Sequence, residues 1–380
     1  MLIIKKDITM NGYYICFGTT STGVLKKITM QSRELSKICN TDILNVKIKK
    51  RSALTKVVSL LPWAPIGFDY DDLFAQIIDP MFLYIRRVTS DSDLIKFLKR
   101  IRLKYPSCKI VVECYTYPYD KDDFNRNVKF FVENLPHYLK DLIYRKKYKG
   151  CIDRFVTYSD DEYIFEVPTI QTANGVDVDR EIAAERSVDD TIDLISVAHM
   201  QVHHAYERII EGLKEYYENG GKEKIKIHMV GEGPEKSKYE RQVNQYGLQD
   251  HVIFYGRKTG NELDEIYKKA DIALASFGLY KYDIKIISTL KMCEYLAKGL
   301  PVLSGCRTSM LAPYTPDFIL EFSNDATPID MNRVIDFYRE FCLTDTKKLT
   351  EKIRGFAKQY MDISVVMKPV LDFINEGKCE

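Results

Sequence analysis

The sequence alternates short runs of β-branched and aromatic residues with longer stretches of helical periodicity, and this alternation constrains the fold more than any other feature. In the first half, the apolar runs at residues 13–17, 43–46, 81–85 and 109–113 are typical of strands, and helical patterns occupy 24–38 and 92–105. In the second half, runs at 193–197, 225–230, 251–255, 272–275 and 301–303 alternate with helical patterns at 205–217, 235–246, 261–269 and 290–298. Compact apolar strands separated by helices predict an α/β chain with parallel sheets covered on both faces.

The chain is long enough for two such domains, because domains usually contain about 100–200 residues. The join is expected within residues 168–179 (PTIQTANGVDVD), where Asn-Gly is a strong turn signal. The helical stretch at 346–374 fits either half. Ligands of doubly wound sheets bind outside the carboxyl ends of the strands, so function is expected in the loops that follow the strands.

The charged residues divide unevenly between the halves. Residues 1–150 hold 27 Lys and Arg against 15 Asp and Glu, a formal balance of +12, and the remainder holds 29 against 39, a balance of −10. Two halves of opposite sign indicate modules with different partners, although solvated lysine faces explain the same count.

Nine scattered cysteines without a Cys-x-x-Cys pair predict a reducing compartment, with neither a disulfide framework nor a zinc site. No apolar run approaches the roughly 18 residues of a spanning helix, and lysine follows the first four apolar residues too soon for a secretion signal. A cytoplasmic protein is expected.

Two glycine-bearing loops follow strands and lead into helices. Gly18 and Gly23 bracket the loop after the first strand, and Gly231-Glu232-Gly233 follows the strand at 225–230. Glycines let a backbone approach a ligand closely, and helix N-termini favour anions. Neither loop matches a dinucleotide-binding or Walker fingerprint, so a plain strand-to-helix turn is the alternative interpretation of each.

Three of the six histidines, His199, His203 and His204, lie within six positions. Imidazole is a common zinc ligand, but no recognised metal motif is completed, although Glu207 follows His203 by four positions. Hydrogen bonding to phosphate oxygens at the start of the next helix is the preferred interpretation, and plain surface positions are the alternative. No metal and no cofactor are therefore expected.

Residues 276–304 are the most informative segment. Ser288-Thr289-Leu290 begins a helix that presents Lys291 and Glu294 on one face. Free N–H groups at a helix start suit a diphosphate, a lysine neutralises it, and a carboxylate accepts hydrogen bonds from ribose hydroxyls. A surface Lys–Glu pair is the alternative interpretation of this spacing.

Together these motifs resemble glycosyltransferase family 4, the retaining transferases with two facing Rossmann-like domains (GT-B). The resemblance is carried by ordered motifs: Asn174-Gly-Val-Asp177, residues 195–213, Val230-Gly-Glu-Gly-Pro234, and residues 251–256, 267–272 and 294–302. It covers residues 150–310 well and residues 1–150 loosely. It implies an acceptor-binding domain at 1–172 and a donor-binding domain at 173–360, each a parallel sheet flanked by helices, with the C-terminal helix 361–380 packed back on the first.

The sequence departs from the family pattern at several positions, which makes it a divergent member. His199 and His204 stand where the family has an arginine and a lysine that grip the diphosphate. Of the paired glutamates, only Glu294 is kept, and Ile286 replaces the other. The runs 204–208 (HAYER) and 291–294 (KMCE) resemble a looser group within the family, with Cys293 in place of its arginine.

The resemblance implies a metal-independent hexosyltransferase that transfers sugar from a UDP- or GDP-linked donor with retention. The departing diphosphate gains negative charge, so fixed cations and helix N–H donors are expected to stabilise it. The leaving phosphate oxygen itself can take the acceptor proton, so no general base is named. The expected catalytic residues are Lys291, His204 and Lys281. The expected donor-binding residues are His199, Gly231, Glu232, Gly233, Arg257, Ser288, Thr289, Leu290 and Glu294.

The expected acceptor-binding residues are Gly18, Gly23, Arg86, Glu113, Tyr117 and Tyr119. The tyrosines offer stacking platforms for sugar rings, with packing beneath a loop as the alternative, and Arg86 is a partner for an acceptor diphosphate. The basic half suits a glycan or lipid-linked acceptor at an anionic membrane, at about 1 kcal/mol per well-placed Lys or Arg. This favours cell-surface polysaccharide or glycoconjugate synthesis by a cytoplasmic protein, peripheral at the inner face of the plasma membrane. No nucleic-acid partner is expected, because the charges form no recognised motif.

A different class of function also fits the departures. Ile286 and the two histidines are consistent with a catalytically degenerate GT-B partner protein, which binds sugar nucleotide or a sister transferase without turnover.

Overall fold

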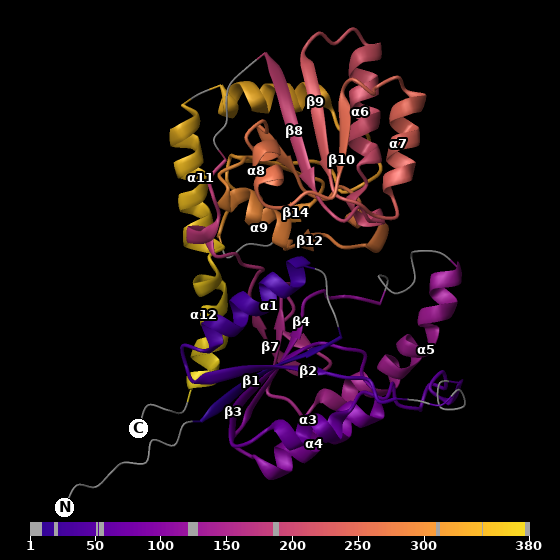
Figure 1. The fold of residues 1–380 in the computed structure, drawn as a ribbon, viewed down its shortest axis with the longest axis vertical. Coiled ribbons are helices and arrows are strands. Elements are labelled where there is room, and N and C mark those ends of the chain that lie inside the picture. The colour runs from indigo at the N-terminus through magenta and orange to yellow at the C-terminus, as the bar shows by residue number, and fades with distance from the viewer. Residues whose placement is uncertain are drawn as a thin grey trace, which may run out of the picture. The chain divides into compact units, whose positions relative to one another are not determined.

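The chain divides into two compact units in the computed structural model, which describes residues 10–18, 22–50, 52, 57–120, 128–184, 190–308, 312–343 and 345–376. Unit 1 is Met1–Ala173 with Val366–Glu380, and unit 2 is Asn174–Val365. The boundaries expected from the sequence were 172/173 and 360/361. Each unit contains a parallel sheet with flanking helices (Figure 1).

The sheet of unit 1 has the strand order β2-β1-β3-β4-β5-β7-β6. Its strands are β1 (Asn11–Phe17), β2 (Asn40–Val46), β3 (Pro80–Arg86), β4 (Lys109–Cys114), β5 (Arg154–Thr157), β6 (Tyr163–Ile164) and β7 (Val167–Gln171). All neighbours pair in parallel except β6, which is antiparallel to β7. Parallel pairing brings the carboxyl ends of β3, β4 and β5 to one edge.

Both faces of this sheet are covered, as the continuous apolar strands predict. Ile15 and Leu83 point into a core shared with α3 (Tyr70–Gln76) and α4 (Ser92–Lys104), while Tyr14 and Tyr84 are buried on the opposite face. The remaining helices that begin in this part of the chain are α1 (Thr22–Leu35), α5 (Val128–Tyr144) and the short η1 (Arg145–Tyr148). Asp91 caps α4 by accepting hydrogen bonds from the N–H groups of Asp93 and Leu94, which fixes where that helix begins.

The last helix of the chain completes unit 1. In α12 (Ile363–Asn375), Val370 and Ile374 are buried, and the Phe373 ring lies beneath the Lys109 ammonium and the Arg154 guanidinium. Thr172 donates a hydrogen bond to the Val366 carbonyl. Unit 1 is therefore built from both ends of the sequence.

Unit 2 contains a fully parallel six-stranded sheet in the order β10-β9-β8-β11-β13-β15. These strands are β8 (Thr191–Val197), β9 (Lys224–Val230), β10 (Val252–Gly256), β11 (Ile272–Leu274), β13 (Val302–Ser304) and β15 (Ile319–Glu321). A separate two-stranded sheet pairs β12 (Ile286–Ile287) with β14 (Arg307–Thr308). The β8–β9 register ends at Val197 opposite Val230, so the loops after these two strands begin side by side.

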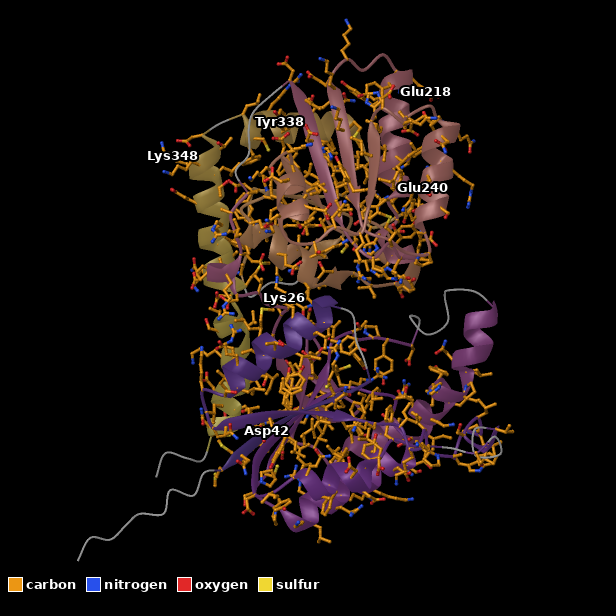
Figure 2. The ribbon with its side chains drawn as sticks, viewed as in Figure 1. Lys26, Asp42, Glu218, Glu240, Tyr338 and Lys348 are labelled. Carbon is orange, nitrogen blue, oxygen red and sulfur yellow. The ribbon has the colours of Figure 1, made fainter. Side chains whose placement is uncertain are left out.

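Alternate residues of each central strand in unit 2 enter different cores. Leu194 and Met229 pack with α6 (Glu207–Glu218), α7 (Lys236–Gln245) and α10 (Met331–Phe337). Ile195 and Val230 pack with α8 (Asn261–Tyr267), α9 (Leu290–Ala297) and α11 (Thr346–Tyr360) on the other face (Figure 1). Side chains fill the space between the sheet and its helices, while Glu218 and Glu240 point outward (Figure 2).

The structure corrects several expectations about elements. The predicted helical stretch 346–374 is two helices, α11 in unit 2 and α12, most of which belongs to unit 1. The sequence interpretation omitted α5, β5, β6, β7 and β15. Within the described residues the eight cysteines are all free. No described helix is long and apolar enough to cross a membrane.

Candidate functional site

The loops after β8 and β9 form one tightly bonded layer at the carboxyl edge of the unit 2 sheet. The N–H of Ala198 donates to the Val230 carbonyl at 2.9 Å, and the N–H of Met200 donates to the Glu232 carbonyl at 2.7 Å. A Cβ on Gly231 would lie 1.9 Å from the Ala198 carbonyl oxygen. Gly231 and Gly233 also have φ values of +127° and +153°. The absence of side chains at Gly231 and Gly233 therefore lets the neighbouring loop pack closely, and their contact with a donor stays a prediction.

His204 is buried and its tautomer follows from its partner. The N–H of Gln201 donates to Nδ1 of His204 at 2.9 Å, so in the neutral ring the proton lies on Nε2. Burial, helped by the nearby Lys291 ammonium, holds the pKa of His204 well below its usual range. In its neutral form His204 can donate a hydrogen bond from Nε2.

His199 has the opposite arrangement and is exposed. Its Nδ1 lies 3.0 Å from the Glu232 carbonyl oxygen, which can only accept, so Nδ1 carries the proton. The free Nε2 of the neutral ring is then an acceptor. A hydrogen bond from Nε2 of His199 to a phosphate oxygen therefore requires the protonated ring.

Lys291 extends from α9 to the same layer, and its ammonium has only neutral oxygen partners. Its Nζ donates to the Tyr206 hydroxyl at 3.1 Å and to the Ala275 carbonyl at 2.9 Å. Within the described part of the chain, no carboxylate lies within ion-pair distance of it. Burial without a counter-charge holds the pKa of Lys291 well below its usual value. The ammonium is therefore placed to gain from an anion.

Tyr206, which the sequence interpretation did not select, contacts two of the three predicted catalytic residues. Its ring stacks on His204 with centroids 5.3 Å apart and planes 12° apart, and its hydroxyl accepts from Lys291. Tyr206 is fully buried. We call these three residues, His204, Tyr206 and Lys291, the Lys291 cluster. The run HAYER offered a signal for Tyr206, because a tyrosine two positions after His204 stands at the start of the helix.

The start of α9 is held by its own side chains and by the segment that begins unit 2. Thr289 caps the helix by accepting from the N–H of Met292, and the Ser288 hydroxyl accepts from the N–H of Asn174 at 2.8 Å. Helix geometry leaves the N–H groups of Leu290 and Lys291 without an intrahelical acceptor. The sequence predicted such free N–H donors at the start of this helix.

The other predicted donor-site residues have varied surroundings. Glu294 is half-buried one turn after Lys291 on α9, Arg257 is exposed directly after β10, and Glu232 accepts from Lys236 at 2.8 Å. Lys281 pairs with Glu207 at 2.6 Å, so part of its charge is already neutralised. The second Glu207 oxygen is buried and has no hydrogen-bond partner.

Two of the departures from the family pattern have structural roles. The Cys293 thiol is buried and donates to the Asn174 carbonyl at 3.3 Å, which helps to fix α9 against the start of unit 2. Ile286 pairs with Arg307 in the small β12–β14 sheet. Arg208, from the run HAYER, is buried and donates to the carbonyls of Phe277, Ser323 and Thr327, so it braces the loops near the Lys291 cluster.

In unit 1, Glu113 is the centre of a buried polar network rather than a ligand-facing group. It is 0% exposed. Its Oε1 accepts from Gln31 at 2.8 Å and from Tyr158, and lies 3.0 Å from the Lys27 ammonium, while Oε2 lies 3.2 Å from Arg86. Burial alone would raise the pKa of Glu113, but the Lys27 ammonium and the Arg86 guanidinium lower it to about 2. Both Glu113 oxygens already have partners within unit 1, and acceptor binding by Glu113 stays a prediction.

The predicted sugar platforms of unit 1 differ from one another. Tyr119 is buried, its hydroxyl donates to Asp141 at 2.6 Å and its ring is covered by Arg87 at 3.4 Å, which matches the alternative of packing beneath a loop. Tyr117 is half-buried and meets Tyr119 edge-on. Arg86 keeps 13% of its side chain exposed and lies over the exposed Tyr115 ring at 4.2 Å.

Gly18 and Gly23 are both exposed. Gly18 has φ +73°, which a side chain would strain. Residues 19–21 of the predicted glycine loop lie outside the described residues. Across the described chain, no group of three or more His, Cys, Asp or Glu side chains could hold a metal ion.

Part of unit 2 is similar to a known protein family. Residues 177–307, which lie within unit 2, match the family model described as glycosyl transferases group 1. The sequence has no significant match among curated proteins.

Solved structures match nearly the whole chain. A glycosyltransferase from Rickettsia africae has a TM-score of 0.65 at 13% identity and covers 97% of this chain and 98% of its own. Sucrose-phosphate synthase from Thermosynechococcus elongatus gives 0.64 at 13%, and Anabaena Alr3699/HepE in complex with UDP gives 0.63 at 10%, each covering 96% of this chain and 99% of its own. The chain has the two-domain GT-B fold of these structures.

Proposed function

We propose that the protein is a glycosyltransferase that takes a sugar from a UDP- or GDP-linked donor bound at the carboxyl edge of the unit 2 sheet. The observation that carries this proposal is the ammonium of the half-buried Lys291, which lies among neutral oxygens with no carboxylate partner in the described chain. The match of residues 177–307 to glycosyl transferases group 1 supports the reaction class, and the UDP bound in the Anabaena protein supports the donor class.

The proposed mechanism relies on fixed charge and fixed donors. As the bond from sugar to diphosphate breaks, negative charge grows on the leaving phosphate, and preorganised groups stabilise it without reorganisation. Lys291 supplies the charge, neutral His204 donates from Nε2, and the N–H groups of Leu290 and Lys291 donate from the start of α9. Tyr206 positions both His204 and Lys291. Glu294 accepts from the ribose hydroxyls.

We further propose that transfer retains the anomeric configuration and needs no metal ion. In this mechanism the leaving phosphate oxygen accepts the proton of the acceptor hydroxyl, so no carboxylate nucleophile is required. The protein cations then neutralise the diphosphate in place of a metal. The acceptor is a glycan or lipid-linked glycan bound by unit 1 at an anionic membrane, where Arg86, Tyr117 and the exposed Tyr115 are the proposed contacts.

The direct test measures binding and turnover separately. The purified chain is titrated with UDP and with GDP by calorimetry, and nucleotide release from UDP-glucose, UDP-galactose and GDP-mannose is then followed. Lys291→Met keeps the length of the side chain and removes its charge. Lys269→Met is the matched control, because Lys269 is exposed and precedes β11 at the amino edge of the same sheet.

We expect Lys291→Met to weaken nucleotide binding and slow release, and Lys269→Met to change neither. Equal behaviour of the two variants would refute the site. Tight UDP binding by the wild-type chain without release from any donor would instead favour a catalytically degenerate partner protein. Ile286, in place of a family glutamate, is the observation that favours that alternative.

A further inference from the structure

A segment of unit 1 exposes an unusual number of large apolar side chains. Val57, Leu60 and Trp63 have 64%, 57% and 64% of their surface exposed, and Val58 and Leu61 are also exposed. Single exposed apolar residues are common, but a contiguous group marks a surface that binds something. Trp63 is the only tryptophan in the sequence.

The backbone of this segment is fixed by a buried lysine. Lys140 of α5 is 0% exposed, and its ammonium donates to the carbonyls of Ser59 and Leu61. The segment closes on itself through hydrogen bonds from Leu60 to Val57 and from Leu61 to Val58, both at 3.0 Å. The buried Lys140 binds the carbonyls of Ser59 and Leu61, while the apolar side chains of the segment are exposed to solvent.

Helix α5 continues this surface and adds positive charge. Ile143 follows Lys140 by three positions, so it lies next to it on the helix, and 45% of it is exposed. Lys147 follows Tyr144 by three positions, and its ammonium lies 4.6 Å from the Tyr144 ring centroid. Lys146 and Lys147 are exposed and appear in no ion pair within the described chain. Apolar residues therefore adjoin unpaired lysines.

We propose that this surface docks the protein on an anionic lipid bilayer. The apolar docking face consists of Val57, Val58, Leu60, Leu61, Trp63 and Ile143. Tryptophan favours the membrane–water interface, and lysines beside an apolar surface gain from anionic headgroups. The +12 balance of residues 1–150 points the same way. A symmetric pairing of two copies through this face would bring the same lysines against one another, so charge favours lipid.

The apolar docking face supplies the residues for the membrane contact named under the proposed function, and the docking proposal rests on that function. Vesicle binding is measured without nucleotide, so failure of the docking proposal is separable from failure of the donor site. Because Trp63 is the only tryptophan, its fluorescence reports the docking face directly. The full chain is mixed with phosphatidylcholine vesicles, alone or with about 30 mol% phosphatidylglycerol, and with brominated forms of the same lipids.

Two variants separate docking from general surface effects. Val57→Ser/Leu60→Ser removes two exposed apolar side chains and keeps the reporter. Leu103→Ser is the matched control, because Leu103 is 85% exposed on α4 in the same unit. UDP affinity is measured for both variants and should equal that of the wild-type chain.

We expect a blue shift and bromine quenching of Trp63 on the anionic vesicles and weak binding to neutral ones. The double variant should lose about tenfold or more in partitioning, and Leu103→Ser should lose little. Absence of quenching, or equal quenching in both variants, would overturn the proposal. A Trp63 shift that depends on protein concentration without lipid, together with dimers in sedimentation, would assign the face to a second copy instead.

Discussion

Binding of a nucleotide diphosphate should take up a proton at Lys291. In the free chain the ammonium is buried and its partners are the Tyr206 hydroxyl and the Ala275 carbonyl, so burial lowers its pKa. A bound diphosphate adds the missing opposite charge and favours the protonated amine. The pKa of Lys291 therefore rises on binding, and between its free and bound values the complex holds more protons than the separate molecules.

The sign and size of the pH effect follow from this difference. Affinity is fully present below the free pKa of Lys291 and is lost as pH rises through the interval towards the bound pKa. Each pKa unit of difference corresponds to about 1.4 kcal/mol, or roughly tenfold in affinity. Calorimetry in two buffers of different ionisation enthalpy measures the proton uptake. The titrations should be made above about pH 7.5, where imidazoles and phosphates have lost their protons.

Lys291→Met should abolish both the proton uptake on binding and the decrease of UDP affinity with rising pH. It should also weaken UDP binding at neutral pH by about 10- to 150-fold, the value of a charge-assisted hydrogen bond of about 1.5–3 kcal/mol. Lys269→Met should retain the pH dependence of UDP affinity seen in the wild-type chain. Proton uptake that survives Lys291→Met would show that another group titrates, and it would refute the role given to Lys291.

Further predictions concern both units. Glu113→Gln leaves the Lys27 and Arg86 charges without their carboxylate and should cost about 3–5 kcal/mol in urea unfolding. Because the pKa of Glu113 is lowered to about 2, its contribution to stability in the wild-type chain is present above the unfolded value of about 4.3 and is lost as pH falls towards 2, which acid unfolding will show. Gly231→Ala should lower the melting temperature because of its φ and its close carbonyl contact, whereas Gly355→Ala, within α11 and with open space around its Cβ, should raise it slightly. Removal of divalent cations with EDTA should leave nucleotide release unchanged if protein cations neutralise the diphosphate, and a loss restored by added magnesium would contradict that mechanism.

The sequence was sufficient for the elements with a clear pattern. Ile15 and Leu83 lie in strands that are apolar along most of their length, and the burial of these strands on both faces follows from that pattern. The two-residue strands β6, β12 and β14 are too short to show a period, so they could not be identified. Helix α5 includes Pro136, which interrupts the expected helical pattern.

The candidate site was less predictable, because its chemistry depends on distant partners. Nothing near Glu113 in the sequence reveals that Lys27 and Arg86 neutralise it. The proton positions on His199 and His204 depend on backbone groups that only the folded loops bring close. Lys291 was identified from its place at a helix start, but its lack of a carboxylate partner is a property of the packing.

The division of the chain also sets an order of folding during synthesis. Unit 2 is one continuous stretch, Asn174–Val365, so all of it has left the ribosome before α12 is complete. Unit 1 lacks Val370 and Ile374 until α12 emerges, although most of its sequence precedes unit 2. Because these core residues follow unit 2 in the sequence, we expect the sheet of unit 1 to complete its packing only after unit 2 has been made.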